Sequence, residues 1–424
     1  MSIREIFQPS NSEEKIVGTL IFLFPIFFLT IRGWANTISF LIFFVSLFHI
    51  AKDIRFYICD RGKTFWWFFG VLVTPFLAQL IAQLGRGNII GSSLDGPARF
   101  LIAAIAFIYL SRTKISHASL LSAGCILSVF ASGISLMLVP DYYWGHRAAT
   151  YFVDPITLPC YLIGCVALMG QIRLNQYMRF WATVVVAILM ALAAYTVIES
   201  QSRSSMVAFL GLIITESYIV AKYGPKSTRI SFLVICVLTI FVGFYFSDVV
   251  TNRVSEAIHE VRLFFSDNIN TSSGIRLGLA QMDLLLFVNS PVFGVPDGSL
   301  PPIEWFSDRG MTITEAVYNQ KLFTGSHNEI LAHLSREGAF GLASVASLFL
   351  IPVGVFYKFS SSSSHRLSFA AQAGLTFSVV IFLSGLTIQV FNLKMTSTFY
   401  AFVLSILFAQ IVSSLDLIKA KNTR

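Results

Sequence analysis

Apolar and polar positions alternate along this chain on the scale of whole segments. Twelve apolar runs approach the roughly 20 residues that a helix needs to cross about 30 Å of hydrocarbon. They are residues 17–31, 35–51, 64–84, 98–111, 119–139, 155–170, 180–198, 206–220, 230–246, 339–356, 367–388 and 396–415. One long polar insertion, residues 247–338, separates the ninth run from the tenth. The pattern predicts an all-α integral membrane protein of about twelve transmembrane helices with one large helical loop.

Composition supports the membrane class. Hydrophobic residues make up 55% and charged residues 12% of the 424 residues, whereas a soluble domain carries about 25% charged residues. The predicted organisation is a membrane domain of nine helices (1–246), a loop domain (247–338) and a membrane domain of three helices (339–424).

The basic residues indicate how the helices are oriented. With both chain ends in the cytoplasm, 18 of the 30 Lys and Arg residues lie on that side, and 6 lie in short outward loops. The remaining 6 lie in the insertion. Because positive charge in short loops marks the cytoplasmic side, the insertion is predicted to face outward.

The outward basic residues are also biased in type. Ten of the twelve are Arg, whereas the cytoplasmic set has nine Arg and nine Lys. Topology requires only positive charge, so it does not explain the bias. Arginine grips phosphate or carboxylate groups through two parallel hydrogen bonds at partly dry sites. The bias therefore favours an anionic ligand on the outward face.

The insertion has helical patterns of its own. Apolar residues recur at helical spacing and predict an amphipathic helix, at Val250, Val254, Ile258, Val261 and Phe265. A second helix is predicted over 274–288, with Ser273 as its N-cap and Ser290-Pro291 as its stop. Residues 291–311 are rich in Pro, Gly and Asp and predict a loop. A third helix is expected to start after Ser326.

Three outward ionisable residues are predicted at helix starts. Arg203 follows Ser202 at the start of the eighth membrane helix, Arg276 follows the expected cap of the second insertion helix, and His327 follows Ser326. Helix N-termini bind anions, and a cation there is unfavourable. The two arginines therefore indicate an anionic ligand that compensates their charge.

The His327 segment also has a plainer interpretation. Ser326-x-x-Glu329 matches a capping box, which favours a structural role for Glu329. His333 is interpreted as structural, and its spacing does not fit the H-E-x-x-H pattern of zinc enzymes. By itself His327 is better explained as an ordinary loop histidine. Its outward position and its arginine neighbours are what favour chemistry.

Missing motifs narrow the function further. The sequence contains no Walker A motif, no dinucleotide fingerprint and no D-x-D cluster. Outward carboxylates come singly, so we expect no metal site and no cofactor. The apolar runs contain few ionisable residues, with Glu216 and His49 as the exceptions. The paired intramembrane charges typical of ion-coupled transporters are therefore missing.

Four stretches together resemble the bacterial O-antigen ligase family, within the wider O-antigen ligase/polymerase superfamily of membrane glycosyltransferases. Each stretch is degenerate alone, but their order extends from the first helix to the last. They are Leu94-Asp95-Gly96-Pro97-Ala98-Arg99; His146-Arg147-Ala148-Ala149-Thr150 with Asp154-Pro155; Glu199 to Ser205; and the insertion, with Gly274-Ile275-Arg276, Ser290-Pro291-Val292-Phe293-Gly294 and His327-Asn328-Glu329.

The resemblance implies a GT-C-like fold and a reaction. Such enzymes transfer polysaccharide from undecaprenyl pyrophosphate to the lipid A–core oligosaccharide, at the periplasmic face of the bacterial inner membrane. They are regarded as metal-independent and need no nucleotide. The expected partners are these two glycolipids and membrane lipids, with no nucleic acid.

The resemblance also suggests roles for residues of this chain. His327 matches the family's essential histidine, and Arg203 and Arg276 match its essential arginines. We expect His327 to be the general base of an inverting transfer. Pyrophosphate is expected to be held by Arg203 and Arg276 together with Arg147, Arg99 and Arg86, with Ser202, Asn328 and Glu329 as possible supporting residues.

Two alternatives remain. One is an O-antigen polymerase or a protein O-oligosaccharyltransferase of the same superfamily. Polymerases often have two outward loops with an Arg-x10-Gly pattern, whereas this chain has one large loop, and no outward Arg has Gly eleven positions later. The other alternative is a polyprenyl-lipid flippase or transporter, which needs a charged path that these helices lack.

Overall fold

The structure is a computed structural model, and it describes residues 12–138, 144–145, 147–169, 179–245, 248–264, 271–296, 299–311 and 313–422. Within these ranges every regular element is a helix. The predicted all-α class is therefore confirmed for the described residues.

Each of the twelve predicted apolar runs coincides with a helix over its described residues. These helices are α2 (Ser12–Thr30), α3 (Trp34–Lys52), α5 (Lys63–Gly85), α6 (Asp95–Leu110), α7 (His117–Leu138), α8 (Thr157–Ala167), α9 (Arg179–Ser200), α10 (Arg203–Tyr223), α11 (Lys226–Tyr245), α16 (Glu329–Phe359), α17 (His365–Gly385) and α18 (Lys394–Asn422). Two short helices join them, α4 (Ile54–Ile58) and the 3-10 helix η1 (Gly91–Leu94).

Length and hydropathy make eight of the described helices candidate membrane spans. They are α3, α5, α6 with η1, α7, α10, α16, α17 and α18. Helix α8 has 11 residues, which is roughly 17 Å at 1.5 Å per residue and too short for the hydrocarbon layer. The chain is thus a multi-pass membrane protein by these criteria, and the count of twelve spans stays a prediction.

Most residues in the apolar segments of α17 and α18 are buried. These two helices therefore form the centre of the bundle. Stacked rings attach the neighbouring helices to α18. Phe28 of α2 stacks on Phe399 with ring centroids 4.0 Å apart, and Phe68 of α5 stacks on Phe408 at the same distance. These aromatic pairs add specific geometry to the burial of large side chains, so the bundle is a packed scaffold.

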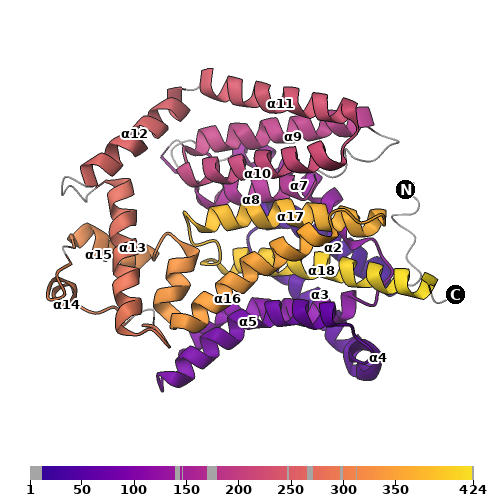
Figure 1. Cartoon of the computed structure of the whole chain (residues 1–424), viewed down its shortest axis with the longest axis horizontal. Coiled ribbons are helices and arrows are strands. Elements are labelled where there is room, and N and C mark those ends of the chain that lie inside the picture. The colour runs from indigo at the N-terminus through magenta and orange to yellow at the C-terminus, as the bar shows by residue number, and fades with distance from the viewer. Residues whose placement is uncertain are drawn as a thin grey trace.

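Segments predicted to be cytoplasmic meet at one end of the bundle. The Lys114 amide donates to Glu14 Oε1 at 3.2 Å, and Arg366 donates to the Lys114 carbonyl at 2.8 Å. Arg61 lies 3.7 Å from Asp416 of α18. In Figure 1, α4 and the end of α18 lie on the right, whereas the insertion helices lie on the left. The segments therefore sort to two ends as predicted, and the assignment of those ends to cytoplasm and periplasm stays a prediction.

The insertion folds around a small core of its own. Its helices are α12 (Asp248–Phe264), α13 (Ser272–Asn289), α14 (Ile303–Ser307) and α15 (Glu315–Thr324). Its buried core consists of Leu279, Met282, Leu286, Phe306 and Val317. The predicted amphipathic helix is confirmed as α12, although Phe265 lies outside the described residues. The predicted loop over 291–311 is interrupted by α14, because Phe306 is anchored in this core.

A kink near the start of α16 joins the insertion to the bundle. Gly338 has a φ of 64°, and a Cβ there would lie 2.5 Å from the Val292 carbonyl carbon. The Ala339 amide instead donates to the Pro291 carbonyl at 2.8 Å. Only glycine combines this conformation with this close approach. The first turns of α16 are thereby held against the segment that follows α13.

Candidate active site

Arg203 is the first residue of α10, as predicted. The Ser202 side chain accepts from the Ser205 amide and caps the helix. The Arg203 guanidinium makes two hydrogen bonds to Glu260 of α12, at 2.6 and 3.0 Å. These hydrogen bonds are the largest cause that lowers the pKa of Glu260 to about 2. The expectation that a ligand must compensate Arg203 is therefore wrong, because a carboxylate of the protein does so.

Arg276 differs from Arg203 because it has no such partner. Among the residues that the structure describes, its guanidinium has no hydrogen bond and no ion pair, although it is partly buried. Burial lowers the pKa of Arg276, and the nearby charge of Arg203 lowers it further, while Glu260 opposes both effects. A partly buried cation without a partner is costly, so this position favours an anionic ligand.

The predicted cap of the Arg276 helix is wrong. The N-cap of α13 is Thr271, whose side chain accepts from the Gly274 amide at 3.0 Å. Ser273 instead donates from its hydroxyl and its amide to Glu260 Oε2, at 2.7 and 3.0 Å. Ser273 therefore holds the Glu260 carboxylate near Arg276. Glu260 in turn holds the Arg203 guanidinium there.

His327 lies in a short link between α15 and α16 rather than in the first turn of a helix. Its φ of 52° is left-handed and incompatible with the helix. Asn328 is the N-cap of α16, and its side chain accepts from the Leu331 amide at 3.0 Å. The predicted cap at Ser326 is therefore wrong, because the chain turns away at His327 before the helix begins.

The His327 ring is held at one edge and is half-buried. Gln320 Nε2 of α15 lies 2.8 Å from His327 Nε2. Burial is the largest cause that lowers the pKa of His327, the charge of Arg276 lowers it further, and Asp154 acts in the opposite direction. The imidazole is therefore neutral at neutral pH, which is the form that accepts a proton.

A cavity of about 300 Å³ borders His327. It lies between the start of α8, the end of α15 and the link that joins α17 to α18. Its lining is Asp154, Ile156, Thr157, Phe323, Thr324, His327, Ile388, Gln389 and Asn392. Asp154 Oδ1 accepts from the amides of Ile156 and Thr157 at 2.9 and 3.0 Å, so the α8 start is fixed beside the cavity.

Arg147 lies near the same acidic residue as His327, and its role in binding phosphate stays a prediction. Its Nε donates to the Ser200 carbonyl at 2.7 Å, which places it at the end of α9. Burial is the largest cause that lowers its pKa, Arg253 adds to it, and Asp154 opposes it. Asp154 therefore lies within electrostatic reach of both Arg147 and His327. The neighbouring His146 lies outside the described residues.

Arg86 and Arg99 are not brought to the His327 cavity. Arg86 donates to the carbonyls of Phe293 and Arg336 at 2.5 and 2.6 Å, which fastens α5 to the kinked part of α16. Arg99 lies 3.4 Å from Asp95 and 5.0 Å from the centroid of the Phe40 ring. Both positions are consistent with structural roles of these two arginines.

Glu329 also has a role that the capping box did not predict. Its Oε1 lies 2.9 Å from His333 Nε2, and its Oε2 accepts from the Phe391 amide at 3.0 Å. His333 Nδ1 lies 2.6 Å from Glu337 Oε2. Asn328 adds a hydrogen bond from its side chain to the Leu386 carbonyl at 3.0 Å. These contacts fasten the start of α16 to the link between α17 and α18.

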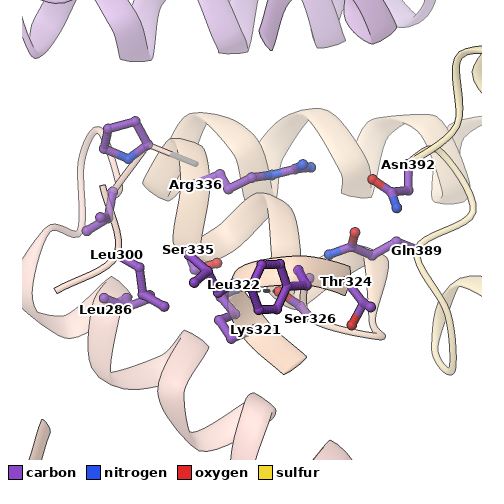
Figure 2. Close-up of a pocket in the computed structure, with 14 residues that line it drawn as sticks. Leu286, Leu300, Lys321, Leu322, Thr324, Ser326, Ser335, Arg336, Gln389 and Asn392 are labelled. Atoms are coloured by element: carbon purple, nitrogen blue, oxygen red, sulfur yellow. Dashed lines mark hydrogen bonds between the residues drawn. The ribbon is translucent and has the colours of Figure 1, made fainter. Parts of the chain in front are cut away.

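Sequence reasoning missed the ion pair that positions the His327 segment. Lys321 of α15 lies 2.5 Å from Asp283 Oδ1 of α13, and Asp283 is fully buried. Lys321 and Asp283 both bind the hydroxyl of Ser326, at 2.6 and 3.1 Å; Figure 2 shows Lys321 and Ser326 together. Ser326 directly precedes His327, so this buried pair limits where the imidazole can lie.

Fold and site together define a multi-pass helical membrane protein with cationic and imidazole side chains gathered at one end of the bundle. The family model described as O-Antigen ligase matches residues 185–346, which is less than half of the chain. The matched region contains Arg203, Arg276 and His327. Over this region the match supports the predicted resemblance to the O-antigen ligase family. The comparison with curated proteins gave no match.

Proposed function

We propose that the protein is an O-antigen ligase at the periplasmic face of the bacterial inner membrane. It transfers polysaccharide from undecaprenyl pyrophosphate to the lipid A–core oligosaccharide. The observation that carries the proposal is the pair formed by His327 and Arg276. A neutral imidazole borders a cavity of about 300 Å³, within electrostatic reach of a cation that has no partner among the described residues.

Arg276 is the primary ligand of the pyrophosphate in this proposal. Its charge is uncompensated, whereas Arg203 is already held by Glu260. Arg203 and Arg147 contribute to the positive field, and Arg147 lies within electrostatic reach of Asp154. Preorganised cations stabilise the charge that develops on a leaving group, commonly by several kcal/mol. No metal ion is required in this arrangement.

His327 acts as the general base on the acceptor hydroxyl. The hydroxyl oxygen forms a bond to the anomeric carbon of the donor sugar, and the bond from that carbon to the pyrophosphate oxygen breaks. The electron pair leaves with the pyrophosphate, and the hydroxyl proton passes to His327. Attack from the side opposite the leaving group inverts the anomeric centre.

Gln320 decides which ring nitrogen is available. With its amide nitrogen toward His327 Nε2, Gln320 donates to the ring, and the ring proton lies on Nδ1. A half-turn of the amide presents its oxygen to an Nε2–H group and leaves the Nδ1 lone pair for the acceptor. The bound pyrophosphate also offsets the charge of Arg276, which raises the pKa of His327 and makes the ring a stronger base when the donor is present.

Product identity tests the proposal. Purified protein is mixed with undecaprenyl-pyrophosphate-linked polysaccharide and rough lipopolysaccharide, and the products are separated on a gel. A polysaccharide ladder on lipid A–core is expected for the wild type. The His327→Ala variant, at equal expression and with normal elution in size-exclusion chromatography, is expected to form none.

Other outcomes identify the alternatives. Longer carrier-linked chains without a ladder on lipid A–core would make the protein a polymerase. Transfer to a polypeptide would make it a protein O-oligosaccharyltransferase. Wild-type transfer by His327→Ala would remove His327 from the chemistry.

A further inference from the structure

A second cavity, of about 180 Å³, borders the start of α16. It is formed by α5, η1 with the start of α6, α16 and the start of α18. In Figure 1, α16 lies between α10 above and α5 below. Its lining residues come from four separate parts of the chain.

The second cavity contains polar side chains that no other part of the described chain uses. Gln79 is 7% exposed and lines the cavity. Its side chain has no hydrogen-bond partner among the described residues, and the same is true of the side chains of Ser92, Ser93 and Asn392. A buried amide without a partner is costly. The buried Gln79 amide therefore points to a ligand that both donates and accepts hydrogen bonds, and the partly buried Ser93 and the exposed Ser92 and Asn392 offer further polar groups beside it.

The charges around the second cavity are matched. Asp95 pairs with Lys394, and Glu337 pairs with His333. This differs from the region of Arg276, where a cation has no carboxylate of its own. Arg336 also lines the cavity and lies 3.9 Å from Glu337, so the cations here have carboxylate neighbours that compete with a bound anion.

The apolar side of the cavity completes a surface suited to a sugar. Phe100 and Phe391 line it, with ring centroids 5.4 Å apart at an interplanar angle of 83°. Sugar hydroxyls donate and accept together, so they suit neighbouring amide and hydroxyl groups. The faces of a sugar ring present C–H groups that pack on aromatic rings. The volume is below the roughly 300–1,000 Å³ of sites for larger ligands, which fits one ring rather than a chain.

Shared lining residues connect the second cavity with His327. Arg336 and Asn392 also line a third cavity of about 180 Å³, and Figure 2 shows Arg336 extending toward Asn392 there. Gln389 and Asn392 line both this third cavity and the cavity of His327. The three cavities thus adjoin along the link between α17 and α18.

We propose that the second cavity binds one sugar ring of the acceptor oligosaccharide. The inference rests on the proposed transfer reaction and adds the residues that hold the acceptor. In an inverting transfer the acceptor must approach from the side opposite the pyrophosphate. Neither Arg203 nor Arg276 lines the second cavity, which shares Asn392 with the His327 cavity, so a glycan anchored there reaches His327 along the shared lining residues.

The test measures acceptor binding and transfer with Gln79→Met, which keeps the length of the side chain and removes its amide. The KM for rough lipopolysaccharide is expected to rise on the order of tenfold, as for the loss of hydrogen bonds to a buried site. The Kd for undecaprenyl pyrophosphate and the kcat at saturating acceptor are expected to stay at wild-type values. Asn392→Ala should also raise the acceptor KM; because Asn392 lines the His327 cavity as well, its kcat is not used as a control.

The control is Gln281→Met, the same change at an exposed position of α13, which should leave the acceptor KM unchanged. Size-exclusion elution and donor binding verify that each variant is folded. Wild-type acceptor KM in both Gln79→Met and Asn392→Ala would overturn the inference and leave the proposed function intact.

Saturation-transfer NMR separates this inference from the proposed function. Delipidated core oligosaccharide should give a signal with wild-type protein that Gln79→Met removes, even if no transfer is observed. If free O-polysaccharide gives the signal that depends on Gln79 and the core oligosaccharide does not, the cavity holds the donor glycan, and the acceptor assignment is wrong. If neither sugar gives a Gln79-dependent signal, the cavity is not a sugar site.

Discussion

Two groups of ionisable side chains at the insertion end of the bundle are built differently. In the arginine group (Arg203, Arg276 and His327) positive charge is in excess, and Arg276 has no partner among the described residues. In the glutamate–histidine group (Glu329, His333 and Glu337) each side chain is buried and hydrogen-bonded to another member.

The difference indicates different roles. Burying a charge is costly unless a partner offsets the loss of water. The glutamate–histidine group meets this requirement internally and fastens α16 to the Phe391 amide. In the arginine group, Arg276 has no such partner among the described residues, so we expect a ligand to supply its counter-charge. Matched charge therefore marks the structural group, and unmatched charge marks the proposed donor site.

The largest effect that we expect is on catalysis by the arginine group. Arg276→Ala should lower the kcat/KM for transfer about 10²- to 10³-fold, because a preorganised charge at the leaving group is lost. It should also weaken undecaprenyl-pyrophosphate binding, measured by titration of the purified protein. Arg309→Ala is the matched control, since Arg309 is an exposed insertion residue stacked on Trp305 at 3.8 Å. Equal donor affinity in Arg276→Ala and wild type would contradict the donor site.

A smaller effect, on stability, is expected from the glutamate–histidine group. His333→Leu leaves two buried carboxylates without their partner and should cost about 3 kcal/mol of unfolding free energy. Thermal unfolding in detergent measures this loss as a lower Tm. The folded fraction should bind undecaprenyl pyrophosphate with wild-type affinity. Normal stability combined with weaker donor binding would place this group in the donor site and remove the distinction between the two groups.

The smallest effect is on pH dependence. A general base must be neutral, so activity falls as the pH drops through the pKa of His327. That pKa is lowered by burial and by Arg276, so the acidic limb of the kcat/KM profile should lie below about 6.5. In Arg276→Ala the second cause is removed, and the midpoint should move upward. A midpoint that stays in place, or moves to lower pH, would contradict the electrostatic contact between these two residues.

Much of the fold could be predicted from local sequence. Apolar runs identified the bundle helices, because a helix in hydrocarbon must be apolar along its whole length. The cap at Ser202 placed Arg203 correctly at the start of α10. The basic residues of each loop predicted the end of the bundle at which that loop lies. This was possible because each loop carries its own basic residues.

The candidate site was predicted only in part. His327, Arg276 and Arg203 were selected, and Arg147 lies near the same acidic residue as His327. The caps at Ser273 and Ser326 were wrong for the same reason: distant charged residues use these hydroxyls, Glu260 in one case and Lys321 with Asp283 in the other. A local capping rule cannot include partners from other helices.

The sequence by itself thus determined the membrane class, the helices, the grouping of the loops and the residue types available for chemistry. Only the tertiary structure decided which charges neutralise one another and which remain. Hydrophobic length and helix capping are properties of contiguous residues, whereas Coulomb interaction and desolvation depend on distances between segments far apart in the chain. For this reason Arg203 and Arg276 look equivalent in the sequence, and the structure separates them through two carboxylates of α12, Glu260 and Glu256, which pair with Arg203.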